Sequence, residues 1–199
     1  MCNLYRMTKT VDEVAQLFKV RRVPGINVSA ETYPGTPGLV IAEGQARSMI
    51  WGFPLSLKGK SGQPLKPKPV NNARTDKLQG GFWRDSFERR RCLILMTGFA
   101  EAEGPKGGKS RTWISVADQP VFACAGIWRD SAEWGAVYSM VMTQANEAMK
   151  PIHDRMPVIL SPNDHACWLA GPSSDAFDLC QPYRDTLSID RTDQPWTSR

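Results

Sequence analysis

Short apolar runs separated by glycine and proline turns dominate the middle of this chain of 199 residues. Such runs, rich in β-branched and aromatic residues and bounded by turn residues, are typical of strands. The clearest of them are residues 39–42, 47–53, 92–96, 113–116, 121–128 and 136–142. Helical spacing is found in residues 11–18, behind Thr10 as N-cap, and in a segment from Ser161 to about Leu169. Residues 76–91, which alternate aromatic and charged residues, are a further candidate for a short helix. The sequence therefore predicts an α+β fold: a single domain built on a curved, mostly antiparallel, barrel-like sheet with a few short peripheral helices.

The domain is predicted to span residues 1–175, and residues 176–199 form a polar C-terminal tail that we expect to pack loosely. A length of this order is sufficient to enclose a full hydrophobic core. Residues 56–69 carry Lys58, Lys60, Lys66 and Lys68 among glycines and prolines, so we expect them to form a mobile basic loop.

Composition narrows the class of function. No apolar run approaches the ~20 residues that a membrane span needs. The first residues, Met-Cys-Asn-Leu-Tyr-Arg, lack the apolar core of a signal peptide, so we expect a cytoplasmic monomer without membrane contact. Five cysteines and two histidines show no metal-ligand spacing, and neither a metal nor an organic cofactor is expected. A net charge of +5 favours a polyanionic partner and an ordinary solvated basic surface about equally.

The dipeptide Met1-Cys2 has an unusual chemical potential. Removal of Met1 would leave an α-amine and a thiol on adjacent carbons. The α-amine, with a pKa near ~7.7–8.0, is partly neutral at pH 7, and the thiol is a good nucleophile once ionised. Together they can close an aldehyde into a five-membered thiazolidine. An incidental second residue is the simpler interpretation when position 2 is considered alone.

Three other stretches combine residue types that suit catalysis or anion binding. Asn72 and Arg74 lie in Pro69–Asp76, where an amide can hold an amine or oxyanion and a guanidinium can clamp phosphate. Glu101 follows the apolar run 92–96, a place where a carboxyl pKa can rise enough for acid–base work. His153 and Arg155 lie between Pro151 and Pro157, which restrict the backbone on both sides. A surface turn, a solvated acid and a structural histidine are the competing interpretations.

Taken in order, the motifs Met1-Cys2, Asn72-Ala73-Arg74, Gly98-Phe99-Ala100-Glu101 and Ile152-His153-Asp154-Arg155-Met156-Pro157 resemble the SRAP (SOS-response-associated peptidase) family of abasic-site processing proteins. The resemblance covers roughly residues 2–170. It implies that Met1 is removed and that Cys2 forms a thiazolidine with the ring-opened aldehyde of an abasic site in single-stranded DNA. Self-processing peptidase activity and lyase-like cross-linking chemistry would accompany this role, in the cytoplasm and on the nucleoid when DNA is bound.

The resemblance also implies roles for individual residues. Cys2 would be the nucleophile, Asn72 would hold its α-amine, and Glu101 and His153 would act as acids or bases. Arg74 would clamp a phosphate, and Trp51 would lie near the DNA path, where an aromatic ring can stack on an exposed base. Arg155 is a further expected DNA contact.

Three positions depart from the family pattern. Leu4 stands where an arginine is usual, so Arg6 is the candidate replacement, with a different side-chain direction expected. Asp76 replaces a glutamate, and Ala100 replaces an aromatic residue. These changes affect DNA contacts and packing more than the proposed chemistry.

Two other functions remain open from the sequence. One is a conventional cysteine peptidase or amidase that uses Cys2 and His153. The other is a non-covalent module for single-stranded DNA that uses Lys58–Lys68 and the arginines at 89–91.

Overall fold

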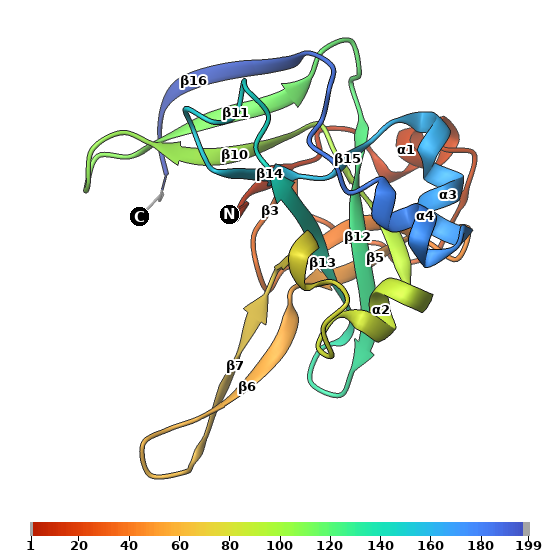
Figure 1. Cartoon of the computed structure of the whole chain (residues 1–199), viewed down its shortest axis with the longest axis vertical. Coiled ribbons are helices and arrows are strands. Elements are labelled where there is room, and N and C mark those ends of the chain that lie inside the picture. Colours follow the sequence, from red (N-terminus) through yellow and green to blue (C-terminus); the bar gives the residue numbers. More distant parts are fainter. Residues whose placement is uncertain (1, 197–199) are drawn as a thin grey trace.

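The computed structural model describes residues 2–196. A closed barrel of five strands forms its centre (Figure 1). Antiparallel pairing links four neighbouring pairs of strands, and a parallel contact of Val137 and Tyr138 with Ile50 and Trp51 closes the ring. In ring order the strands are β4 (Pro37–Ala42), β5 (Gln45–Trp51), β13 (Gly135–Gln144), β12 (Phe122–Ser131) and β9 (Arg91–Met96). The predicted α+β single domain on a curved, mostly antiparallel sheet is confirmed.

Four short strands extend the barrel sheet, and a second sheet of five strands packs against it. The barrel extensions are β2 (Arg21–Arg22), β8 (Asn72–Arg74), β14 (Arg155–Pro157) and β15 (Ile159–Leu160). The second sheet, in spatial order, is β16 (Leu187–Pro195), β11 (Ser110–Val116), β10 (Gly98–Glu103), β1 (Tyr5–Arg6) and β3 (Glu31–Thr32). Glu43 and Gly44 both have positive φ, 52° and 72°, which is the geometry of a two-residue hairpin turn between β4 and β5.

The helices are short and lie at the periphery. They are α1 (Val11–Leu17), α2 (Arg84–Arg89), α3 (His165–Ala170) and α4 (Ser173–Asp178), with 3₁₀ turns η1 (Thr75–Lys77) and η2 (Pro162–Asp164). Thr10 caps α1 as predicted, because its side chain accepts from the Glu13 N–H while Glu13 bonds back to the Thr10 backbone. None of the helices in residues 2–196 is long and apolar enough to span a membrane.

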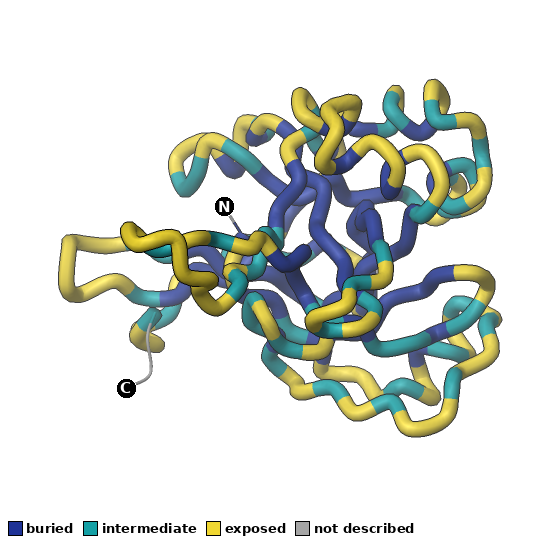
Figure 2. Tube along the Cα trace, turned by 90° about the horizontal axis from the view of Figure 1, so that it is seen from below, coloured by how far each residue is buried: buried dark blue, intermediate teal, exposed yellow. Residues whose placement is uncertain are grey.

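Alternating residues of the barrel strands contribute to two hydrophobic cores. Inward residues such as Val40, Cys92 and Met140 join Tyr5 and Phe99 from the second sheet. Outward residues such as Ile41 and Leu93 pack with the four helices. In Figure 2 the buried strands lie at the centre, with the exposed loops and helix surfaces around them. Cys2 belongs to the inward core, so the N-terminal segment is part of the fold rather than an appendage.

Residues 56–69 do not form the loop that the sequence predicts. They lie in a two-stranded hairpin of β6 (Phe53–Lys58) and β7 (Pro64–Val70), which projects from the barrel as an arm (Figure 1). The expectation of a loop was wrong because the backbone pairing of Phe53 with Val70 and of Leu57 with Leu65 does not require an alternating apolar pattern.

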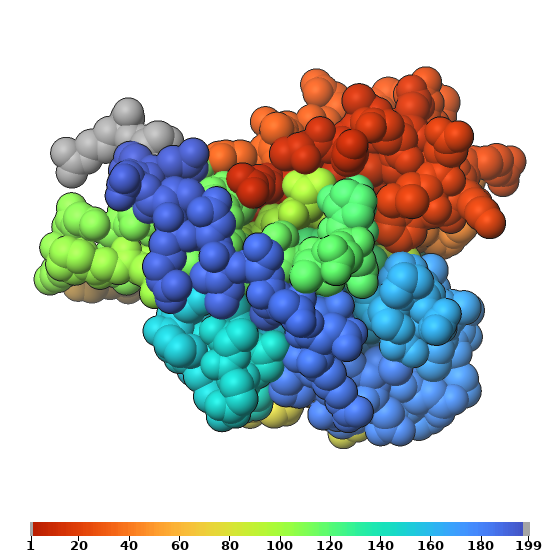
Figure 3. All heavy atoms as spheres, turned by 90° about the horizontal axis from the view of Figure 1, so that it is seen from above, coloured from red at the N-terminus to blue at the C-terminus, as the bar shows by residue number. Residues whose placement is uncertain are grey.

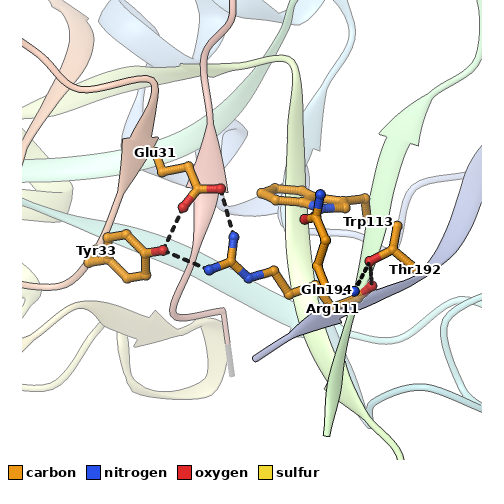
Figure 4. A network of polar contacts seen from close by, with 6 residues as sticks. All are labelled: Glu31, Tyr33, Arg111, Trp113, Thr192 and Gln194. Carbon is orange, nitrogen blue, oxygen red and sulfur yellow. Dashed lines mark hydrogen bonds and ion pairs between the residues drawn. The ribbon is translucent and has the colours of Figure 1, made fainter. Parts of the chain in front are cut away.

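The C-terminal segment is also more ordered than expected. Its strand β16 pairs with β11 along most of its length, so loose packing is wrong for residues 187–195, while the domain boundary at 175 stays a prediction. Side chains reinforce the pairing: Thr192 donates to the Arg111 carbonyl at 2.7 Å, and Trp113 donates to Gln194 (Figure 4). The C-terminal and N-terminal segments consequently lie on one face of the molecule (Figure 3).

Candidate functional site

Cys2 lies at the edge of the inward core and is fully buried. Its thiol lies 3.5 Å from the Leu4 carbonyl, to which it donates. Burial raises the pKa of the Cys2 thiol well above its usual value, and the negative charge of Glu101 raises it further. The thiol is therefore held in its protonated form at neutral pH.

Two neighbouring amides hold the main chain of Cys2. Asn72 Nδ2 donates to the Cys2 carbonyl at 2.8 Å, and Asn71 Nδ2 donates to the same oxygen at 2.9 Å. Asn71 also donates to Asn3 Oδ1 at 3.1 Å. Both amides reach one oxygen because Asn71 falls between β7 and β8, where the alternation of side chains along a strand is interrupted.

Asn71 was not a predicted site residue. The Asn-Asn pair was visible in the sequence, but only its second member matched the family motif. The buried Oδ1 of Asn72 accepts no hydrogen bond from residues 2–196, which leaves an acceptor beside the Cys2 main chain. The predicted contact of Asn72 with an α-amine stays a prediction.

Glu101 lies on β10 with its side chain almost fully buried. Burial raises its pKa from 4.5 to about 7, and the nearby Asp154 carboxylate raises it while Lys109 lowers it. A carboxyl group with a pKa near 7 exchanges protons readily at neutral pH.

His153 is half-buried just before β14. Its Nδ1 accepts from the Arg155 N–H at 3.0 Å and lies 2.8 Å from Asp154 Oδ1. Burial lowers the pKa of the imidazole, with Asp154 acting in the opposite direction. The neutral ring, with Nδ1 as the acceptor, fits the Arg155 bond, and protonation would turn Nδ1 into a donor towards Asp154.

Trp51 lies inside the barrel and is fully buried. Its ring meets Tyr5 edge-on at 5.0 Å, and its Nε1 donates to the Asn71 carbonyl at 2.9 Å. The ring has no exposed face, so the expected stacking on a DNA base does not fit this position. Trp51 instead supports the segment that holds Cys2.

Arg74 is exposed on β8, and Asp76 occupies its guanidinium. Two parallel bonds join them, Nε to Oδ1 at 2.8 Å and a terminal nitrogen to Oδ2 at 2.7 Å. A phosphate would have to displace Asp76 from the same fork. Arg155 is half-buried on β14.

Arg6 and Leu4 share one face of the N-terminal strand, contrary to the expected difference in direction. Leu4 packs with Ala100 and Trp113, and the Arg6 guanidinium lies 4.2 Å from the centre of the Trp113 ring. The space above Ala100 is therefore filled by Trp113 and Leu4. Arg6 lies on this outer face, while the Glu101 side chain takes the opposite face of the sheet.

These observations define a class of protein. It is a β-barrel with a cysteine at the second position, and two amide side chains bind the main-chain carbonyl of that cysteine. A carboxyl group with a pKa of about 7 and an imidazole lie close by. Within residues 2–196, no group of three or more His, Cys, Asp or Glu side chains is arranged to hold a metal ion. The chain belongs to the SOS response associated peptidase (SRAP) family, whose model matches residues 1–194.

Curated relatives carry a consistent name. The chain is 33% identical over 122 residues to the abasic site processing protein YoqW of Bacillus subtilis, a match that covers 56% of this chain and 54% of that protein. It is 25% identical over 195 residues to the abasic site processing protein YobE of the same organism, covering 88% and 84%. The chain thus spans about half the length of YoqW, and a smaller share, 31%, of its Saccharomyces cerevisiae relative YMR114C.

Solved structures share the fold. A Bordetella bronchiseptica protein superposes with a TM-score of 0.80 at 22% identity, covering 96% of this chain and 99% of that one. A Bacteroides thetaiotaomicron protein gives 0.78 at 19% identity, covering 96% and 91%.

Proposed function

We propose that this protein, after removal of Met1, acts in the DNA damage response by forming a covalent cross-link to abasic sites in single-stranded DNA through Cys2. The observation that carries the proposal is the pair of amides on the Cys2 carbonyl beside a buried carboxyl group with a pKa near 7. The names of the relatives, abasic site processing proteins, supply the substrate class.

The chemistry has two steps. In the first, the free α-amine of Cys2 attacks the aldehyde of the ring-opened sugar and a water molecule leaves, so that a C=N bond forms. In the second, the thiol sulfur adds to that carbon, a C–S bond forms, and the thiol proton ends on the nitrogen. The product is a thiazolidine, and no oxidant or cofactor is needed.

The environment of Cys2 favours this order of steps. Because burial raises the pKa of the thiol, the amine is the first nucleophile available at neutral pH. Glu101, poised near pH 7, can donate the proton that the departing water requires and take one back from the amine. Asn71 and Asn72 fix the carbonyl of Cys2 and thereby orient its amine.

The cysteine peptidase alternative has less support. A peptidase cysteine needs a lowered pKa, usually through a hydrogen bond to histidine, whereas the pKa of Cys2 is raised. Removal of Met1, by this chain itself or by another peptidase, is a separate requirement of the proposal.

The test uses a single strand that contains one abasic site, followed on a denaturing gel. We expect a denaturant-stable adduct with the wild-type protein and none with Cys2→Ala. Cys2→Ala and Cys2→Ser both keep the α-amine and lack the sulfur, so each should give only an imine that borohydride traps. Peptide hydrolysis without any DNA adduct would contradict the proposal.

A further inference from the structure

The arm formed by β6 and β7 carries most of the chain's net charge. Residues 53–70 contain four lysines and neither aspartate nor glutamate. The net charge of the chain is +5, of which the arm contributes +4, so the rest of the protein is close to neutral at +1. A basic stretch this concentrated on one projecting element differs from an evenly solvated surface.

Three of the lysines share one face of the arm. Residues that pair across two strands point to the same side, and Lys68 pairs with Leu55 while Lys58 pairs with Pro64. Lys66 lies between Pro64 and Lys68 on β7, two residues from each, and therefore on that side as well. In a regular strand Leu55 and Leu57 would point to the same face. The irregularity between them places Leu57 on the opposite face, where it pairs with Leu65.

The lysine row is available to a partner. Lys58 and Lys66 are exposed, and within residues 2–196 no carboxylate forms an ion pair with any of the arm's lysines. Prolines 64, 67 and 69 remove backbone donors from β7, which hinders pairing with a strand of another protein. Contact along the β7 edge of the arm is therefore left mainly to its side chains.

The arm begins at the candidate site. Strand β7 ends at Val70, and the next two residues are Asn71 and Asn72, which hold the Cys2 carbonyl. A strand of nucleic acid bound at Cys2 thus lies next to the base of the arm. Lys66 and Lys68 are two residues apart, or about 6.6 Å along a strand, close to the separation of phosphates in an extended single strand.

We infer that the lysine row of the arm, formed by Lys58, Lys66 and Lys68, binds the phosphate backbone of single-stranded DNA that flanks the lesion. The inference rests on the proposed function. It adds a second contact, away from Cys2, that lengthens the bound strand and is independent of base sequence.

The experiment compares the triple variant Lys58→Gln, Lys66→Gln, Lys68→Gln with a control that removes three lysines elsewhere, Lys9→Gln, Lys19→Gln, Lys150→Gln. Fluorescence anisotropy would measure binding of undamaged single strands of about 4 and about 16 nucleotides, a range typical of single-strand sites, over a series of salt concentrations. Thermal melts would confirm that both variants fold.

For the longer strand, loss of three phosphate contacts should reduce the slope of log K against log salt by about 2, and weaken binding about 100-fold at 0.1 M salt. The shorter strand can contact fewer of the three lysines at once, so in the arm variant its losses of slope and of affinity should both be smaller. Equal losses in the two triple variants, or no loss in the arm variant, would overturn the inference. The inference would also be overturned if the arm variant lost affinity only for DNA with a double-stranded flank and bound single strands as tightly as wild type.

A cross-linking gel separates this inference from the function on which it rests. If the arm variant loses the affinity for long strands but wild type forms no abasic-site adduct, only the proposed function fails. If wild type cross-links and the arm variant binds long strands normally, only the arm inference fails.

Discussion

Replacement of Glu101 by glutamine should slow the reaction and stabilise the protein, because the same buried carboxyl group accounts for both effects. The pKa of this group is about 7 in the folded protein against an ordinary 4.5. A general acid–base group contributes about 10²–10⁴-fold to a rate, so cross-linking by Glu101→Gln should fall by at least 10²-fold.

The stability effect has a definite sign and pH range. As pH rises above 4.5, the carboxyl group ionises in the unfolded chain while it stays protonated in the fold, so the folded state loses stability up to about pH 7. The shift corresponds to about 3 kcal/mol. Glutamine has no charge to bury, so Glu101→Gln should exceed wild type by up to about 3 kcal/mol at pH 8 and match it near pH 4.

Urea unfolding at pH 4.5 and 8, together with gel time courses, measures both effects. Glu103→Gln is the matched control, since it removes a half-buried carboxylate two residues along the same strand, bonded to Thr112 and Arg191. A stability difference between Glu101→Gln and wild type that does not grow with pH, or an unchanged cross-linking rate, would refute the reasoning.

Four further substitutions test three separate parts of the structure. Asn71→Ala and Asn72→Ala should each slow cross-linking about 5-fold, because each removes one hydrogen bond worth about 1 kcal/mol from the Cys2 carbonyl; an unchanged rate in the double variant would exclude the amide clamp. Asp76→Asn frees the Arg74 fork and should steepen the salt dependence of single-strand binding by about 0.7; an unchanged slope would contradict a phosphate role for Arg74. Gly38→Ala would place a methyl group in steric conflict with the hydroxyls of Tyr5 and Tyr138 inside the barrel, and should lower the unfolding free energy by about 1–3 kcal/mol in urea titrations. An unfolding free energy equal to that of wild type would contradict this steric conflict.

Local patterns predicted the elements that depend on neighbouring residues. The Thr10 cap and the strands at 92–96 and 136–142 all followed from the spacing of apolar residues and from capping chemistry. Closure of the barrel did not, because the parallel contact of β13 with β5 joins segments that are far apart along the chain.

The candidate site was predictable only through its motifs. Cys2, Asn72 and Glu101 were chosen from the sequence, but nothing in the sequence distinguishes a tryptophan on the DNA path from the buried Trp51. Asn71 was not predicted because only Asn72 matches the family motif. The break between β7 and β8, which lets both amides reach Cys2, is not visible in the sequence. The arm was missed because its lysines and prolines have the composition of a loop.

The most direct test of the central claim is the intact mass of the wild-type protein after reaction with an abasic single strand. We expect the mass of the chain without Met1 plus that of the DNA, less one water molecule. Borohydride should add no hydrogen to this adduct, and its N-terminal thiol should resist alkylation, because both nitrogen and sulfur are bonded to the sugar carbon. An adduct that retains Met1, or one that is reducible and leaves the Cys2 thiol free, would contradict the account.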